Sequence, residues 1–86
     1  MKIYRICTEA KNPRTIAKLA GEMFKGCSIW RGEGYWQGKS EASLMVEVFS
    51  ELDLLPTVKA FARYIKKLNA QEAVLIQVIK CQGEFV

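Results

Sequence analysis

The sequence contains no histidine, no C-x-x-C pair, and no apolar run near the roughly 20 residues that a membrane-spanning helix needs. Without histidine, the chain lacks the commonest metal ligand and the side chain that most readily acts as acid or base near neutral pH. We therefore expect no metal, no cofactor and no membrane partner. For the same reason we expect that the protein is not an enzyme.

Disulfides are not expected either. Cys7, Cys27 and Cys81 are odd in number, widely separated and surrounded by apolar residues. This pattern favours buried, reduced thiols over a disulfide framework or a zinc site. The N-terminal residues also lack the long apolar region of a signal peptide. Both observations indicate a cytoplasmic protein.

The length and composition indicate one folded domain, residues 1–86. Half of the residues are hydrophobic and 26% are charged, which is typical of a globular chain. The net charge of +4 favours anionic partners.

Residue spacing in the first third of the chain predicts a strand and then a helix. Residues 2–8 are rich in strand-forming side chains, and the spacing then becomes helical. Asn12 is a suitable N-cap and Pro13 suits the first turn, whereas Gly26 is expected to end the helix in a left-handed conformation. The apolar stripe of this helix consists of Ile16, Leu19, Ala20 and Met23.

The middle of the chain predicts a β-hairpin, with strands at 27–36 and 41–49 and a turn at 37–40. Gly32 and Gly34 lie inside the first strand, where glycine usually marks a bulge or a close backbone approach, so we expect a bend there. The second strand alternates. Leu44, Val46 and Val48 share one face, and Met45, Glu47 and Phe49 share the other.

A second helix is expected at about 56–68, followed by a strand at 71–80. Asp53 near the helix start and lysines near its end suit the helix dipole, and Asn69 can end it. The last strand is almost continuously apolar, which predicts burial on both faces. The polar side of the helix carries a basic patch of Lys59, Arg63, Lys66 and Lys67. A solvated face is its ordinary interpretation, and weak nucleic-acid binding is the less favoured one.

The order strand, helix, strand, strand, helix, strand predicts an α+β protein with the ferredoxin-like βαββαβ fold. This fold is a two-layer sandwich in which two helices cover one face of a four-stranded antiparallel sheet. The other face would carry apolar residues of the hairpin and the last strand. Such residues favour self-association, so we expect a homo-oligomer, dimer or trimer, unless loops or residues 82–86 cover this face.

Glycines, aromatic residues and cations occur together in the hairpin. Aromatic rings can stack on a nucleobase, arginine and lysine can neutralise phosphate, and glycine lets a ligand approach the backbone. The segment opens no helix and contains no G-K-[ST], so it is neither a P-loop nor a dinucleotide fingerprint. Trp30 is expected in the core, whereas Tyr35 and Trp36 could either bind or pack on the hairpin. The predicted ligand-binding set is Arg31, Gly32, Gly34, Tyr35, Trp36 and Lys39.

The hairpin sequence CSIWRGEGYWQGKSEASLMVEV resembles the second strand, loop and third strand of small PII-like proteins. In these, a T-V-x-x-V-x-G-x-G run bends into a loop and returns through a Glu-led strand. The hairpin is similar, too, to short phage-borne α+β proteins with a G-x-W-x-G…E-x-S-L pattern. The resemblance implies trimers that bind nucleotides between subunits at the base of the hairpin loop, here at Gly32, Gly34, Gly38, Arg31 and Lys39. It also implies the host cytoplasm as the location, if a phage encodes the protein.

These observations together predict a non-catalytic, homo-oligomeric binding module that captures a small anionic, nucleotide-derived ligand. One setting is a phage anti-defence protein that acts as a sponge for nucleotide signals. Two alternatives stay open. The protein could inhibit a host or partner protein by docking on it, or bind nucleic acid weakly through the basic patch.

Overall fold

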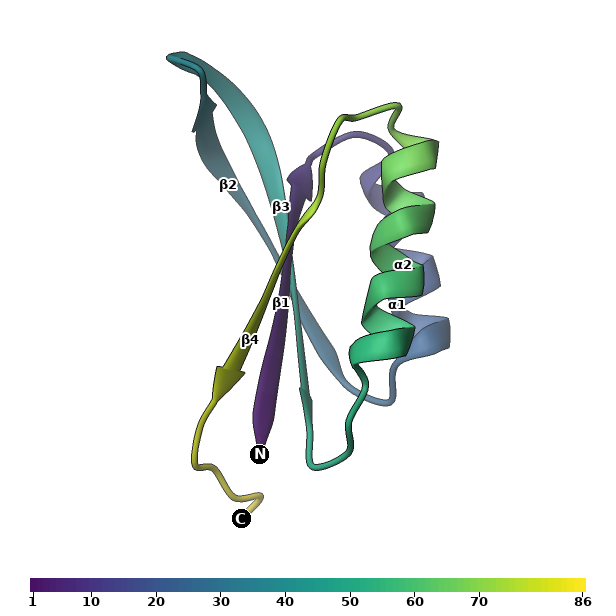
Figure 1. Ribbon diagram of the computed structural model, residues 1–86, viewed down its shortest axis with the longest axis vertical. Helices are drawn as coiled ribbons and strands as arrows, with labels where there is room; N and C mark the ends of the chain where they lie inside the picture. Colours follow the sequence, from purple (N-terminus) through teal and green to yellow (C-terminus); the bar gives the residue numbers. More distant parts are fainter.

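The computed structural model describes residues 1–86 and contains the six expected elements in the expected order. They are β1 (Lys2–Glu9), α1 (Pro13–Met23), β2 (Cys27–Trp36), β3 (Lys39–Ser50), α2 (Leu55–Leu68) and β4 (Leu75–Lys80). The strands form one antiparallel sheet in the order β2-β3-β1-β4. Figure 1 shows both helices on the same side of this sheet. The α+β ferredoxin-like fold is therefore confirmed.

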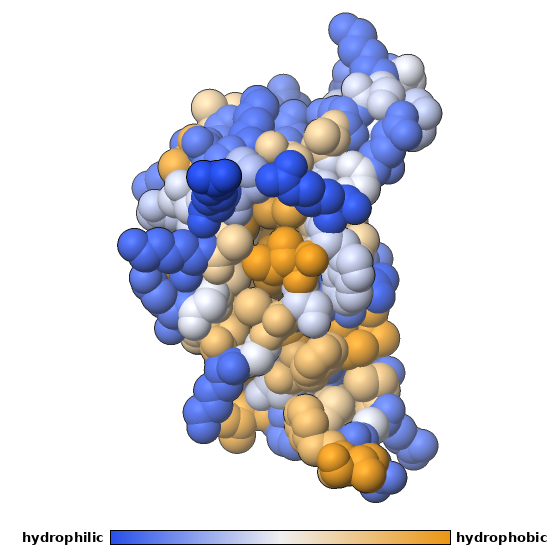
Figure 2. Space-filling view, turned by 180° about the vertical axis from the view of Figure 1, so that it is seen from behind, coloured by the Kyte–Doolittle hydropathy of each residue, from blue (hydrophilic) through white to orange (hydrophobic).

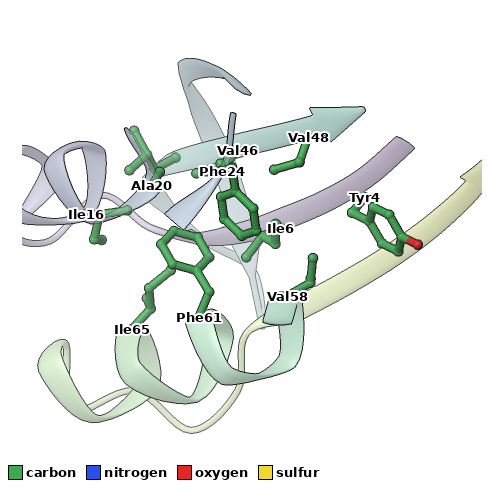
Figure 3. Close-up of a cluster of buried hydrophobic side chains, with 11 residues drawn as sticks. Tyr4, Ile6, Ile16, Ala20, Phe24, Val46, Val48, Val58, Phe61 and Ile65 are labelled. Carbon is green, nitrogen blue, oxygen red and sulfur yellow. The ribbon is translucent and has the colours of Figure 1, made fainter. Parts of the chain in front are cut away.

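The core lies between the helices and the covered face of the sheet. Each helix contributes residues spaced three and four apart, so one stripe of each helix faces the sheet. Phe24 and Phe61 meet edge to face with their ring centroids 5.4 Å apart, which joins the end of α1 to α2 (Figure 3). The buried apolar cluster consists of Tyr4, Ile6, Ile16, Ala20, Phe24, Leu44, Val46, Val48, Val58, Phe61 and Ile65.

Tyr4 connects the sheet to the start of α2. Its ring is fully buried, and its hydroxyl oxygen accepts the backbone N–H of Leu54 at 3.0 Å. Asp53 accepts the backbone N–H of Leu55 at 3.1 Å, so it caps the first turn of α2 as well as complementing its dipole. These contacts satisfy the polar groups where the chain leaves the sheet and enters the helix.

The β2–β3 hairpin turns at Gln37 and Gly38, which confirms the turn expected at 37–40. Both residues have positive φ, 52° and 80°, as the tight two-residue hairpin turn requires. The pairing runs without interruption from Cys27 opposite Val48 to Trp36 opposite Lys39.

Of the bulge and the close backbone approach that glycine inside a strand usually marks, the bulge is absent at Gly32 and Gly34, because no extra residue enters the ladder. A Cβ at either position would meet β3 only at ordinary van der Waals distance, so the neighbouring strand does not require glycine there. A Cβ added at Gly32 would lie 3.4 Å from the hydroxyl oxygen of Ser43, and one at Gly34 would lie 3.5 Å from the Cβ of Ser43. The two glycines therefore make a flat strip beside β3.

Burial of the last strand on both faces is also wrong. β4 begins at Leu75 rather than at residue 71, and it is an edge strand that pairs only with β1. Only its residues that face α2 approach the core, and Leu75 on the other side is 55% exposed. The apolar run therefore marks an uncovered surface.

Two helix ends differ from expectation. Asn12 precedes α1 as expected, but it has φ 51° and makes no side-chain cap; its amide donates to Asn69 at 3.0 Å. The helix ends at Met23 and Phe24 is already extended, so Gly26 is not the left-handed cap residue. Asn69 follows the last turn of α2 as expected, and its side chain donates to Gln71 at 2.8 Å. Side-chain contacts at the start of α1 and at the end of α2 thus replace local caps there.

Ala70 offers a test of this loop, since it adopts φ 51°, a left-handed conformation that costs an L-residue roughly 1–2 kcal/mol. Ala70→Gly should raise the free energy of unfolding by about 0.5–1 kcal/mol, because glycine removes the strain but loses more chain entropy. Urea denaturation measures the change. The matched variant Ala60→Gly, inside α2, should lower stability by about 1 kcal/mol. Equal destabilisation by both variants would contradict the strained loop.

Candidate functional site at the projecting hairpin

The β2–β3 hairpin projects beyond the helices as an arm (Figure 1). Figure 2 shows this projection in mostly hydrophilic and near-neutral colours, whereas apolar residues gather over the lower part of the body. Because residues directly opposite each other in a ladder share a face, the pairing of β2 with β3 assigns each hairpin residue to one of two faces. We call these the helix-side face and the open face.

Arg31, Glu33 and Tyr35 lie on the helix-side face, opposite Leu44, Ala42 and Ser40. Tyr35 is 71% exposed and donates its hydroxyl to Glu33 at 3.1 Å. The hydroxyl of Ser40 donates to the same carboxylate oxygen at 2.6 Å. The two hydrogen bonds, that of Ser40 first, lower the pKa of Glu33. A fixed carboxylate therefore stands between the arginine and the tyrosine.

The open face of β2 carries the other half of the predicted set. Gly32 and Gly34 lie on it, and Trp36 lies directly opposite Lys39 at the tip. Trp30 is on this face opposite Met45 and is 50% exposed, so the expectation of a core tryptophan is wrong. Trp36 is 58% exposed. Trp30 and Trp36 lie at the two ends of the flat strip that the glycines make.

The structure therefore divides the six predicted ligand residues into two groups. Trp36 and Lys39 are brought together on the open face. Arg31 and Tyr35 lie on the helix-side face, with Glu33 between them. No single face of one subunit presents the whole set.

A pair of carboxyl groups stands beside the open-face strip. Glu41 lies opposite Gly34, and Glu9 reaches it from β1. Desolvation comes first in raising the pKa of Glu41, followed by the hydrogen bond and the charge of Glu9, whereas the charge of Lys11 opposes the rise. Lys11 makes an ion pair with Glu9 at 3.3 Å. Two carboxyl groups thus lie on the open face beside the glycine strip.

Farther along, the open face is apolar with one ion pair at its centre. Arg5 binds Glu47 at 3.0 Å, and their side chains are only 32% and 13% exposed. Burial raises the pKa of the Cys7 thiol beside them. All three cysteines are free and half-buried rather than fully buried.

Residues 82–86 are exposed and leave the face uncovered. Its apolar side chains are Ile3, Met45, Phe49, Leu75 and Ile79.

The basic patch of α2 lies apart from the hairpin. Lys59, Arg63 and Lys66 line a groove between α2 and β4, whereas Lys67 lies outside it. No group of histidine, cysteine, aspartate or glutamate side chains is placed to hold a metal ion. Neither helix is long and apolar enough to cross a membrane.

Comparison with known proteins places the chain among solved structures of the same fold. A phage SAM lyase in its apo state superposes with a TM-score of 0.71 and 16% identity, over 90% of this chain and 78% of that one. The PII-like protein CutA from Nostoc sp. PCC 7120 gives 0.70 and 21% identity, over 94% and 81%. CPII, a nitrogen regulatory PII-like protein from Thiomonas intermedia K12 bound to ADP, AMP and bicarbonate, gives 0.65 and 16%, over 98% and 94%.

The resemblance to PII-like and phage proteins is thus confirmed for the fold. The identities are low, so the likeness extends to the fold alone. No protein-family model matches the sequence, and no curated protein matches it.

Two functional features were missed at the level of sequence. One is the Glu33–Ser40 contact, which joins residues seven apart in the chain across the turn. The other is the division of the set into two faces. The division could have been found from the sequence, because successive side chains of a strand point to opposite faces. Arg31 and Tyr35 are at odd positions, whereas Gly32, Gly34 and Trp36 are at even positions.

The Glu33 cluster makes a pH prediction. Because the folded pKa lies below its ordinary value, the hydrogen bonds to Glu33 are complete above the unfolded pKa and are lost as the pH falls through the folded pKa. Ser40→Ala should therefore raise the pKa of Glu33 toward its ordinary value. NMR titration of the Glu33 carboxyl carbon measures this. Ser28→Ala, on the opposite face of β2, is the control, and an equal shift in both variants would contradict the assignment.

Proposed function

We propose that the protein is a non-catalytic, homo-oligomeric module that captures a small anionic ligand, derived from a nucleotide, at the hairpin. The observation that carries the proposal is the exposure of aromatic rings beside cations on the projecting arm. Trp36 stands across from Lys39, and Tyr35 shares a face with Arg31. A ring can stack on the base while a cation neutralises the phosphate. Gly32 and Gly34 let the ligand approach the backbone of β2.

A second copy of the chain would complete this site. The two groups of residues face in opposite directions, so a ligand that contacts both must lie between the hairpin of one subunit and the surface of another. The uncovered apolar face of the sheet supplies a reason for such copies to associate. Each buried valine- or leucine-sized side chain contributes roughly 1.5–3 kcal/mol.

Adenine-containing compounds are the first ligands to test. CPII carries ADP and AMP, and the phage lyase acts on SAM, which contains an adenosine. The same fold thus serves an enzyme in the lyase, so turnover of SAM has to be measured along with binding. Within a phage-infected cell, a capture protein of this kind would act in the host cytoplasm as a sponge for nucleotide signals.

The first test is the affinity of the hairpin for its ligand. Calorimetry with ADP, AMP, cyclic nucleotides and SAM should find a ligand, and Trp36→Ala should weaken its binding about 5- to 150-fold, because stacking on a base contributes roughly 1–3 kcal/mol. Tyr64→Ala, an exposed aromatic on α2, is the matched control and should leave the affinity unchanged. Arg31→Ala should also weaken binding, whereas Arg14→Ala on α1 should not.

Two results would contradict this proposal. In one, none of these compounds binds and the wild type and the hairpin variants are equally inert. In the other, SAM is consumed at a rate that rises with protein concentration, which would make the protein an enzyme.

The second test is the oligomeric state. In sedimentation at high concentration the wild type should have the mass of a dimer or trimer, and Phe49→Lys should shift it toward one subunit, because a charge would then lie on the open face. Leu52→Lys places the same charge on a more exposed residue outside the sheet and should leave the mass unchanged. If the wild type sediments as a single subunit, no second copy is present to complete the site, and the proposal is contradicted.

A further inference from the structure

A groove runs between α2 and β4, on the side of the molecule away from the β2 edge. One concave region of about 330 Å³ lies in this groove, and a second of the same volume, lined by α2 and the loop before it, adjoins the groove and shares Lys59 and Arg63 with it. Lys66 continues the same row, so three cations spaced four and three residues apart form one wall. Ala73, Val74 and Ile76 form the opposite, apolar wall. None of the three cations makes an ion pair in the structure, although Asp53 and Glu72 also line the groove.

The unpaired edge of the sheet begins at this groove, where Ile76 of β4 lines it. The backbone N–H of Cys81 donates to the carbonyl oxygen of Met1, the residue before β1, at 3.1 Å. Because antiparallel pairs alternate, every second residue back along β4 turns its polar groups toward β1. Ile76, Val78 and Lys80 therefore direct their N–H and C=O groups outward, where no strand pairs with them. Ile76 and Val78 lie opposite Ile6 and Tyr4 and share the helix-side face with them.

We propose that this groove binds an acidic, extended peptide segment of a partner protein, which adds to β4 as a fifth, antiparallel strand. In such an addition, the peptide residues opposite Ile76 and Val78 place their side chains toward α2. Carboxylates at alternate positions are about 6.7 Å apart, and the row from Lys59 to Lys66 is about 10 Å long. Two to three acidic side chains can thus meet the three cations.

The walls of the groove favour a peptide over a nucleic acid. No aromatic side chain lines it for stacking on bases, and the edge offers amide groups at the repeat of a β-strand. Ligand capture at the hairpin does not require this surface, because β2 and β4 are opposite edges of the sheet. The two proposals can therefore fail separately.

The experiment uses the unaltered protein and a synthetic octapeptide of alternating glutamate and threonine, blocked at both ends. Fluorescence anisotropy should show saturable binding that weakens as salt is added. A peptide of the same composition with its glutamates in one block should bind at least tenfold more weakly. Methylation of the glutamate backbone nitrogens should abolish binding, because in antiparallel addition these N–H groups face β4. Methylation of the threonine nitrogens should not.

Variants test the two walls. Lys59→Glu with Arg63→Glu should weaken binding at least tenfold, whereas Lys18→Glu with Lys25→Glu makes the same charge change elsewhere and should not. Val78→Pro removes one outward N–H, a change that an edge strand tolerates. This variant should bind the peptide more weakly than Val78→Thr does. The methylated peptides test the edge even if Val78→Pro fails to fold.

Three results would overturn the proposal. The two methylated peptides could bind equally, which would leave only charge attraction. A single-stranded oligonucleotide of equal charge could bind more tightly than the peptide, which would make the groove a nucleic-acid surface. Val78→Pro, but not Val78→Thr, could lower the oligomer mass, which would assign the edge to contacts between copies of this chain.

Discussion

The uninterrupted pairing of β2 with β3 determines which side chains of the hairpin share a face. A single extra residue in either strand would move every later side chain to the other face of the sheet. Because the ladder has none, Trp30, both hairpin glycines and Trp36 share the open face, and Arg31 and Tyr35 share the helix-side face. The two-residue turn at Gln37 and Gly38 holds this register at the tip. The chemistry of the arm thus follows from its alternation as much as from its composition.

Both helices pack on the same face of the sheet, and this leaves the other face without a covering layer. Two short amphipathic helices bury the central part of one face of the sheet and leave the other face to water. On that uncovered face, the side chains of Arg5 and Glu47 are already mostly removed from solvent. A charge pair that keeps its partner can enter an interface without leaving either charge unpaired, which would be strongly destabilising. This face can therefore be covered without loss of its central contact.

Most of the fold could be predicted from local spacing, because each element has the periodicity of its own class. The alternation of Leu44, Val46 and Val48 and the stripe of α2 are examples. The errors arose where tertiary contacts override local preference. Asn12 has a partner in Asn69, 57 residues away, instead of capping its own helix. The ladder passes the hairpin glycines without a bulge, and an apolar run in β4 suggested burial where the strand is an edge.

For the candidate site, the sequence could identify the residues but not the face of the sheet on which each one lies. A shift of one residue in the strand pairing would move every side chain to the other face. The resulting division limits affinity. One stacked ring contributes roughly 1–3 kcal/mol, whereas micromolar binding requires about 8 kcal/mol. Trp36 with Lys39 alone would therefore hold a nucleotide only weakly, and so would Tyr35 with Arg31. A tight ligand needs both groups and a surface that excludes water from them. On one subunit the sheet itself separates the two groups, so the proposed tight capture requires self-association.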